Sequence, residues 1–307
     1  MENVVLQTHS INKLYKNTNA LKNIDISLCQ GHIYGFIGEN GAGKTTLLRI
    51  ITGLTFPTTG ELILFGKRSK LDLEIGRRQI GSTIESPAFY PNYTAERNLE
   101  LQRILVGNPD KSIVGKTLQL VGLADCKSKT VKDFSMGMKQ RLGIALSLIG
   151  TPRMLILDEP INGLDPKGIA DLRTILQKLN KEQKITILIS SHILSELYLL
   201  ATDYIIIHQG RIIDTLTHEE LDTKCQKYIA IRMNDISVGV TVLEEELHTS
   251  NFKVMEDGTV FLYEYINDVA AVAEALRKHG LLVTHIALSE QTLEEYYLSV
   301  TEGGSNV

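Results

Sequence analysis

The 307-residue sequence has few cysteines and no excess of basic residues. Its three cysteines, Cys29, Cys126 and Cys225, are widely separated and form neither a CxxC pair nor an even set. This pattern is typical of unpaired thiols in a reducing compartment. The net charge of -4 gives no support to the clustered basic excess that marks a nucleic-acid-binding surface. We therefore expect a cytoplasmic protein that binds no nucleic acid.

Long apolar runs and a secretory leader are also missing. The most apolar stretches, LGIALSLI at 142–149 and YIIIH at 204–208, are far shorter than the roughly 18 residues that cross a bilayer. The first residues, MENVVLQTHSINKLYK, lack a basic segment followed by an apolar one, so no secretory signal is expected. Any role at a membrane then requires a separate partner.

The composition is that of a folded chain with more than one core. Hydrophobic residues make up 43% and charged residues 22% of the sequence, close to the averages of globular proteins. The length exceeds that at which a single core usually stops growing. We expect one large domain and a smaller one.

The segment GENGAGKT, residues 38–45, has the spacing of a polyphosphate-binding loop. It lies between an apolar strand-like run, IYGFIG, and a helix-like run, TTLLRIITGL. Backbone N–H groups and the positive end of that helix would converge on phosphate oxygens. Lys44 would reach the β- and γ-phosphates and Thr45 would bind Mg²⁺. The alternative is a glycine-rich turn that matches by accident. The predicted nucleotide-binding residues here are Gly38, Glu39, Asn40, Gly41, Ala42, Gly43, Lys44, Thr45 and Thr46.

A second segment, MLILDEP at 154–160, is an apolar strand that ends in two acids. Ligands of open parallel sheets bind at the carboxyl ends of the strands. We expect Asp158 to hold Mg²⁺ through water and Glu159 to polarise the water that attacks the γ-phosphate. The alternative is an acidic turn before Pro160.

A third apolar strand, ITILISSH at 185–192, places His192 at the same edge of the sheet. A histidine at a strand end is, however, more often a hydrogen-bonded polar residue than a functional one.

The segment DFSMGMKQRLGIALSLIG, residues 133–150, predicts a helix that begins at Ser135. The orphan N–H groups at its start form an anion site, yet no phosphate loop of this chain precedes it. The helix is therefore free to bind a nucleotide held by another molecule.

Together these segments resemble the ATP-binding cassette of ABC transporters, in which the signature helix of one subunit caps the γ-phosphate held by the other. Ser135 and Gly137 match the serine and second glycine of the family's LSGGQ signature, while Met136 and Met138 depart from it. The resemblance implies an α/β fold: a P-loop NTPase core of the RecA type with an antiparallel β part and a helical subdomain. It covers residues 1–222, with the helical subdomain at about 86–150.

The resemblance assigns roles to further positions. Tyr15 matches the aromatic residue that stacks on adenine, and the alternative is an ordinary tyrosine of an amphipathic strand. Asp165 in NGLDP matches the loop that lines the dimer interface, and it also fits a helix-capping acid before Pro166. His192 matches the histidine that senses the γ-phosphate.

Glu85 stands where the family usually has a glutamine that touches Mg²⁺ and the attacking water. A carboxylate still offers oxygen to a hard cation, but it donates no hydrogen bond and adds negative charge beside the triphosphate. IESPAFYP, FSMGMKQRLGIA and the chain length together resemble ATP-binding subunits of bacitracin-type and lantibiotic export and immunity transporters.

The helical subdomain is implied to meet a coupling helix of the membrane subunit, with the loop at Glu85 as its hinge. YTAERNLELQRIL and IVGKTLQLVGL predict its helices. Tyr90, Pro91 and Tyr93 are candidates for contact with that partner, and packing within the loop is an equally good explanation.

Residues 223–307 predict a small α+β domain. KYIAIRM at 227–233 suits a strand, and FKVMEDGTVFLYE at 252–264 suits a hairpin with Asp257-Gly258 as a two-residue turn. NDVAAVAEALRKHG predicts a helix capped at Asn267 or Asp268, and QTLEEYYLSVT predicts a last helix. LEEEL at 243–247 is interpreted as a solvated helix face.

The resemblance implies an ATPase that, as a homodimer or pseudo-dimer, binds two MgATP and drives a separately encoded membrane permease from the inner face of the cell membrane. Two alternatives stay open. One is a non-transport ABC ATPase of translation or DNA repair, which usually carries two cassettes or a long coiled-coil insertion. The other is an ATPase that reports antibiotic encounter to a kinase.

Overall fold

The computed structural model describes residues 3–85, 87–126, 129–225, 227–255, 257–290 and 292–302. The chain divides into two compact units, residues 1–218 and 219–307. The boundary that we predict at residue 222 falls inside a short helix, α8 (His218–Lys224), four residues beyond this division.

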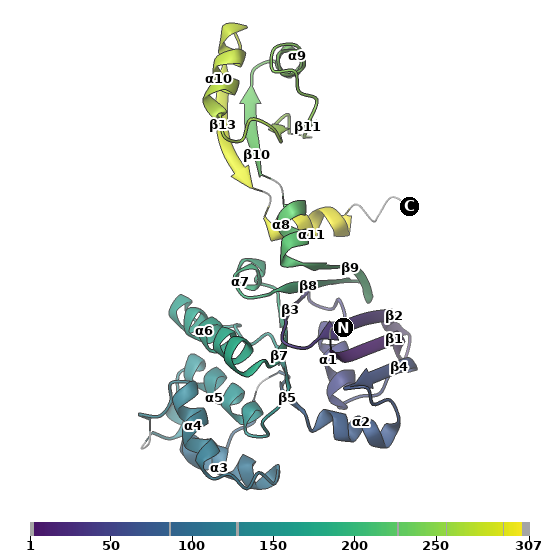
Figure 1. The fold of residues 1–307 in the computed structure, drawn as a ribbon, viewed down its shortest axis with the longest axis vertical. Helices are drawn as coiled ribbons and strands as arrows, with labels where there is room; N and C mark the ends of the chain where they lie inside the picture. Colours follow the sequence, from purple (N-terminus) through teal and green to yellow (C-terminus); the bar gives the residue numbers. More distant parts are fainter. Residues whose placement is uncertain are drawn as a thin grey trace. The chain divides into compact units, whose positions relative to one another are not determined.

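A mixed six-stranded sheet forms the centre of the first unit (Figure 1). Four of its strands are runs of mostly buried, mainly apolar residues, as expected for strands that are covered on both faces. Adjacent strands are parallel except for the last pair, which is antiparallel. In spatial order the strands are β5 (Ile80–Thr83), β6 (Met154–Asp158), β7 (Thr186–Ser191), β3 (Ile33–Ile37), β8 (Asp203–His208) and β9 (Arg211–Thr217).

A three-stranded antiparallel sheet lies beside helix α1 (Lys44–Thr52) on one side of this centre (Figure 1). Its strands, in spatial order, are β2 (Thr18–Cys29), β1 (Val4–Tyr15) and β4 (Thr59–Leu64). Leu47, Leu48, Ile50 and Ile51 of α1 are fully buried in a core shared with both sheets. That core fixes α1, and with it the glycine loop that precedes the helix.

Helices cover the other side of the six-stranded sheet and extend away from it (Figure 1). The predicted helices between 87 and 134 are confirmed as α3 and α4, and both carry an apolar face. The helices of this unit are α1, α2 (Lys70–Arg77), α3 (Ala95–Leu105), α4 (Ser112–Leu120), the 3-10 turn η1 (Val131–Asp133), α5 (Met136–Leu148), α6 (Pro166–Gln183) and α7 (Leu194–Tyr198).

The second unit is a four-stranded antiparallel sheet with a β-α-β-β-α-β chain order, so the predicted α+β class is confirmed. Ile229, Ile231, Val260 and Leu262 from one face of the sheet are buried against its two helices, α9 and α10. The elements are β10 (Lys227–Met233), α9 (Ile236–Glu245), β11 (Phe252–Val254), β12 (Val260–Leu262), α10 (Val269–Lys278), β13 (Val283–Glu290) and α11 (Leu293–Glu302).

Two local predictions for this unit have different outcomes. The cap of α10 is confirmed, because Asp268 accepts a hydrogen bond from the backbone N–H of Ala271. The two-residue turn is wrong. Val254 pairs with Val260, which centres the hairpin on Asp257, and the Asp257 carboxylate accepts a hydrogen bond from the Thr259 N–H at 3.0 Å. This bond favours a longer connection, of which residue 256 lies outside the described residues.

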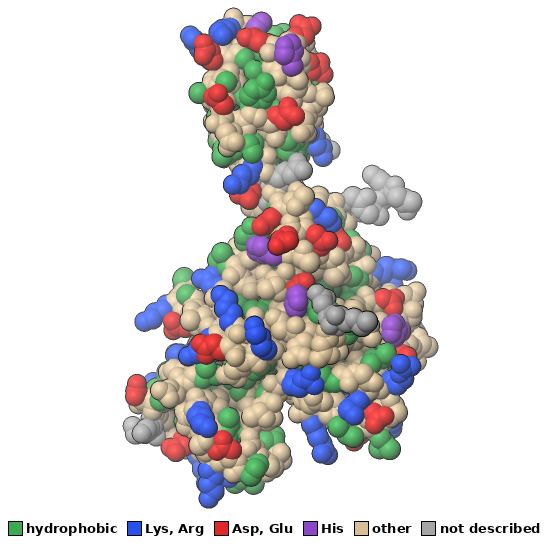
Figure 2. Space-filling view, in the orientation of Figure 1, with side chains coloured by type: hydrophobic (Ala, Val, Ile, Leu, Met, Phe, Trp, Pro, Cys, Tyr) green, Lys and Arg blue, Asp and Glu red, His purple; other side chains and the backbone are tan. Residues whose placement is uncertain are grey.

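The surface gives no continuous area of one charge on the face drawn in Figure 2, where acidic and basic side chains both occur across the described residues. Within the described ranges, no helix combines the length and the apolar character needed to cross a bilayer.

Candidate nucleotide-binding site

The glycine loop follows β3 and leads directly into α1. Gly41 and Gly43 have φ values of +87° and +113°, in the left-handed region that glycine adopts without strain. A Cβ at Gly43 would come within 2.8 Å of the Ala20 carbonyl oxygen, and one at Gly38 within 2.5 Å of the Ile207 carbonyl oxygen. Backbone conformation therefore favours glycine at position 41, close packing on β8 requires it at position 38, and both reasons apply at position 43.

Lys44, the first residue of α1, is buried and curls back over the loop. Its ammonium donates to the carbonyl oxygens of Gly38 at 2.5 Å and Glu39 at 3.2 Å, and lies 3.5 Å from the Glu159 carboxylate. A buried cation at the start of a helix, with free N–H groups around it, favours the binding of an anion.

Strand register brings the loop and the acidic strand together. Ile37, the last residue of β3, pairs with Ser191 of β7, and Asp158, the last residue of β6, pairs with Ser190. The three carboxyl ends therefore form one row at the same edge of the sheet. Across this row the Thr45 hydroxyl donates to Asp158 Oδ2 at 2.8 Å, and Ser190 Oγ donates to Asp158 Oδ1 at 2.6 Å.

Glu159 follows this row with a φ of +49°, which turns its side chain toward the loop. Its Oε2 is 2.7 Å from His192 Nδ1 and also accepts from the His192 backbone N–H at 3.3 Å. Its Oε1 is buried and, among the described residues, accepts no hydrogen bond, although Lys44 is 3.5 Å away. A buried acceptor without a donor is costly, so this oxygen is suited to a water molecule in the site.

A small hollow of about 170 Å³ links these groups. Most of the predicted residues of the glycine loop line it, together with Glu159. Ala20 of β2 also lines it, and the sequence interpretation missed this residue because no local motif marks it. The lining residues are Ala20, Glu39, Asn40, Gly41, Gly43, Lys44, Thr45, Thr46 and Glu159. Gly38 and Ala42 do not line the hollow. The Gly38 carbonyl oxygen accepts a hydrogen bond from Lys44, and the Ala42 side chain is buried.

The oxygen atoms present fit a magnesium ion only in part. The Thr45 hydroxyl and the Asp158 carboxylate lie side by side, and both are ligands that this hard cation accepts. No group of three or more acidic, histidine or cysteine side chains suited to a metal occurs within the part of the chain that the structure describes. This agrees with the usual protein site for Mg²⁺, in which substrate phosphates and water complete the octahedron.

The remaining predicted residues lie outside the hollow. Ser135 is exposed at the start of α5 and accepts from the Met138 N–H at 3.3 Å, so the predicted cap is confirmed, and Gly137 follows in the first turn. Asp165 is exposed and caps α6 by accepting from the Gly168 N–H at 3.1 Å. Tyr15 is 41% exposed at the end of β1, with Lys13 Nζ 4.7 Å from its ring centroid.

Glu85 follows β5 and has a φ of +62°. Its carboxylate is bound by the guanidinium of Arg49 from α1, a residue that the sequence interpretation did not single out. Ser190 was also missed, although it both holds Asp158 and accepts from the Glu159 N–H at 2.9 Å. The only signal for Ser190 was the pair of serines that ends an otherwise apolar strand.

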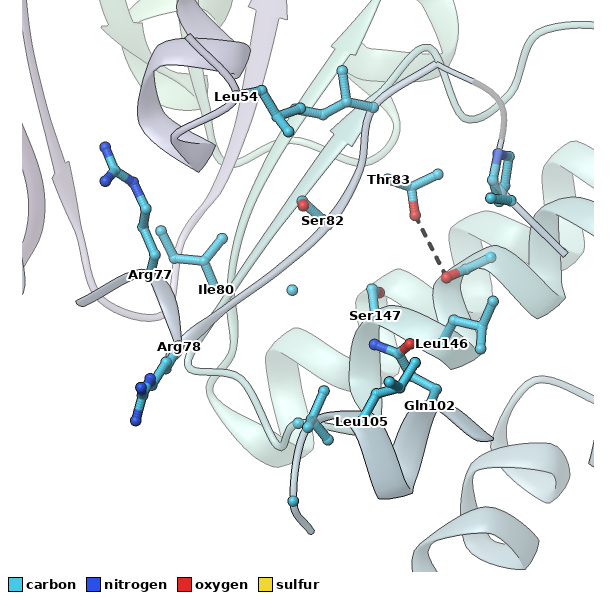
Figure 3. Close-up of a pocket in the computed structure, with 18 residues that line it drawn as sticks. Leu54, Arg77, Arg78, Ile80, Ser82, Thr83, Gln102, Leu105, Leu146 and Ser147 are labelled. Carbon is cyan, nitrogen blue, oxygen red and sulfur yellow. Dashed lines mark hydrogen bonds between the residues drawn. The ribbon is translucent and has the colours of Figure 1, made fainter. Parts of the chain in front are cut away.

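A separate groove of about 920 Å³ lies between the sheet edge and α3 and α5 (Figure 3). Leu54 and Leu105 on its rim are 69% and 76% exposed. On its floor the Thr83 hydroxyl donates to the Gly143 carbonyl oxygen at 3.5 Å, and Ser82 and Ser147 lie nearby (Figure 3). The polar residues Arg77, Arg78 and Gln102 complete the walls. Tyr90 and Tyr93 do not line it; their rings pack together, with centroids 5.5 Å apart.

Comparison with known proteins identifies close relatives. The model of the ABC transporter family matches residues 21–162. The bacitracin transport ATP-binding protein BcrA of Enterococcus faecalis is 40% identical over 300 residues, which cover 98% of this chain and 97% of that protein. The lantibiotic transport ATP-binding protein SrtF of Streptococcus pyogenes is 44% identical over 210 residues, or 68% of this chain and 89% of that protein.

Solved structures agree with the fold. A dimeric ATP-binding cassette in a post-hydrolysis state, bound to ADP and Pi, superposes with a TM-score of 0.63 at 25% identity and covers 69% of this chain and 98% of its own. CbiO1 of Clostridium perfringens, part of an ABC transporter complex, gives a TM-score of 0.65 at 25% identity over 80% of this chain and 97% of its own. The predicted cassette fold is therefore confirmed.

Proposed function

Because the chain belongs to the ATP-binding proteins of ABC transporters, whose activity is ATP hydrolysis coupled to transport, we propose that it powers a transporter for peptide antibiotics of the bacitracin or lantibiotic type. The observation that carries this proposal is the match to bacitracin transport proteins over nearly the whole chain, with 40% and 38% identity in two organisms. The match to these two proteins covers the second unit, residues 219–307, whereas the family model covers only residues 21–162.

Different residues around the hollow bind the phosphates, hold the metal and accept the proton during ATP hydrolysis. Lys44 and the N–H groups at the start of α1 hold the β- and γ-phosphates. Thr45 and Asp158 would hold a Mg²⁺ ion, which would supply positive charge to neutralise the triphosphate. Glu159 accepts a proton from the attacking water through its buried oxygen, while His192 fixes the orientation of the carboxylate.

The site is completed by a second molecule. The hollow of about 170 Å³ is smaller than the roughly 300–1,000 Å³ of typical small-molecule sites, and Ser135, Gly137 and Asp165 are absent from its lining. We assign these three residues to the nucleotide held by the partner copy, and Tyr15 to the adenine ring of the nucleotide held by its own copy. The exposed N-terminus of α5 supports this assignment because its N–H groups are available to an anion.

A membrane permease is the second partner, and we place the chain beside it at the inner face of the cell membrane. The groove between the sheet edge and α3 and α5 suits a short amphipathic helix of that permease, since its rim is apolar and its walls are polar. Leu105 and Leu54 supply exposed apolar anchors.

Changing Leu105 to glutamate is expected to reduce co-purification with the membrane protein encoded beside this chain at least 10-fold, because a charge would be buried in the contact. ATP binding should stay unchanged, since Leu105 lies outside the hollow. Leu282→Glu is the matched control, a similarly exposed leucine of the second unit, and should co-purify normally. Normal co-purification of the Leu105 variant would contradict the groove assignment.

Antibiotic tolerance tests the function itself. A susceptible bacterium that expresses this chain with its adjacent membrane protein should tolerate at least 4-fold more bacitracin or lantibiotic, and Lys44→Ala should abolish the gain at equal protein level. Unchanged tolerance to both peptide classes would contradict the proposal. Induction of a kinase response without export of peptide would favour the sensor alternative instead.

A further inference from the structure

Helix α2 presents apolar side chains to solvent. Leu71 and Ile75 lie one turn apart on one face of the helix and are 76% and 49% exposed. Phe56, in the loop that follows α1, is 61% exposed, and Lys70 Nζ at the start of α2 is 5.8 Å from the centroid of its ring. None of these residues lines the nucleotide-binding hollow or the groove. The proposed function therefore leaves this apolar surface without a role.

The loop that carries Phe56 is held beside α2 by hydrogen bonds. Its carbonyl oxygen accepts from Lys13 Nζ at 2.7 Å. At the last residue of α2, Arg77 Nε donates to the Ile51 carbonyl oxygen at 3.1 Å, while Phe56 lies near Lys70 at the first. The loop therefore runs along the length of the helix, and its exposed ring and the exposed side chains of α2 belong to one surface.

Basic residues flank these apolar side chains. The segment KRSKLDLEIGRR, residues 67–78, has five basic and two acidic residues, which leaves a net charge of +3, although the whole chain carries -4. Both acids have local partners, because the Asp72 carboxylate accepts from the hydroxyl of the helix cap at 2.6 Å and Glu74 interacts with the charge of Arg77. Arg68 is 68% exposed, and its ion pair, 3.9 Å long with an exposed acid, is weak. The surface around α2 is therefore locally positive.

We propose that the α2 patch, defined as Phe56, Arg68, Lys70, Leu71 and Ile75, binds the surface of a membrane that contains anionic lipids. The basic side chains attract the headgroups, and the apolar ones enter the boundary between headgroups and acyl chains. An acidic protein would match the charge as well, but apolar side chains that protrude this far suit insertion among headgroups. The contact goes beyond the proposed function, because it requires neither a permease nor an antibiotic.

The α2 patch adjoins the groove proposed for the permease. Leu54 lies in the same loop as Phe56 and lines the groove, as do Arg77 and Arg78 at the end of α2. Lipid and permease would therefore bind to neighbouring surfaces of one unit. The nucleotide-binding hollow lies at the other end of α1, a helix of nine residues or roughly 14 Å, so lipid binding should leave nucleotide affinity unchanged.

Sedimentation of the full chain with lipid vesicles, in the absence of any permease, tests the proposal. Vesicles of phosphatidylcholine with about 40% phosphatidylglycerol should bind the chain at least 5-fold more tightly than vesicles of phosphatidylcholine alone, and high salt should reduce this preference. Leu71→Gln combined with Ile75→Gln should weaken binding to the anionic vesicles at least 5-fold, and Arg68→Gln combined with Lys70→Gln should do the same. Unchanged ATP binding by each variant shows that its fold is kept.

Matched changes in the second unit serve as controls. Arg277→Gln combined with Lys278→Gln removes two basic residues at the end of α10, and Lys278, like Arg68, forms an exposed ion pair. Leu282→Gln removes an exposed leucine. Both controls should change vesicle binding less than 1.5-fold. Equal losses in the control and patch variants would show a general effect of charge or hydrophobicity and would overturn the proposal.

Two further results would also overturn it. One is a wild-type chain that binds anionic vesicles no better than neutral ones. The other is normal vesicle binding by the variant of Leu71 and Ile75 together with loss of its co-purification with the adjacent membrane protein, which would make the α2 patch a protein contact. Failure of this proposal is distinct from failure of the proposed function, because antibiotic tolerance conferred by a chain that binds no vesicles would leave that function intact.

Discussion

Replacing Glu159 by glutamine is expected to slow ATP hydrolysis about 10³-fold while nucleotide binding is retained. The amide keeps the size of the side chain but cannot accept the proton of the attacking water. The buried Oε1 that faces the loop is the atom whose basicity is lost. Phosphate release measures the rate, and sedimentation in the presence of MgATP should show a persistent dimer, because the nucleotide that joins the two copies is no longer consumed.

Glu196→Gln is a suitable control for this variant. Glu196 is a partly buried acid of the same unit that pairs with Arg173 at 3.1 Å, away from the residues that line the hollow. Its substitution should change hydrolysis less than 2-fold. Hydrolysis at the normal rate by Glu159→Gln would remove Glu159 as the base and would require another proton acceptor in the site.

Replacing Ser135 by arginine is expected to reduce ATP hydrolysis at least 100-fold, although Ser135 does not line the nucleotide-binding hollow of its own chain. The long side chain would fill the N-terminus of α5, where the partner's γ-phosphate is proposed to bind. Binding of nucleotide to the separate monomer should be unchanged. The two measurements, turnover and monomer binding, therefore respond differently to one substitution.

Ser69→Arg separates this effect from a simple loss of helix capping. Ser69 caps α2 as Ser135 caps α5, by accepting a backbone hydrogen bond, here from Asp72 at 3.2 Å. Loss of either cap costs about 1 kcal/mol of stability. Equal inhibition by the two substitutions would show that Ser135 acts only through the fold.

The sequence predicted those parts of the site that depend on short contiguous segments. The glycine loop is recognisable because Gly41 and Gly43 must adopt positive φ and because strand, loop and helix follow one another directly. Asp158 and Glu159 are recognisable because an apolar strand ends in them. The caps Ser135 and Asp268 are equally local, since each accepts a hydrogen bond from the N–H three residues later.

Contacts between distant segments could not be predicted in this way. Ser190 binds Asp158 across 32 residues, and Arg49 binds Glu85 across 36. Their pairing depends on strand register and on the packing of α1, neither of which a single segment encodes. The hairpin over 252–264 was predicted correctly, but its turn was not. The Asp257 carboxylate accepts a hydrogen bond from the Thr259 N–H, and this bond favours a longer turn than the Asp-Gly pair alone suggests.

Mixing two inactive variants tests whether each reaction site is built from two copies of the chain. Lys44→Ala removes the phosphate-binding lysine, and Ser135→Arg blocks the proposed cap. In a mixed dimer one site carries both defects and the other carries neither. Hydrolysis is negligible for each variant alone and is expected to return on mixing to roughly a quarter of the wild-type rate, because half of the dimers are mixed and each has one intact site. A mixture as inactive as its separate components, in a sample where mixed dimers are shown to form, would contradict the shared reaction site.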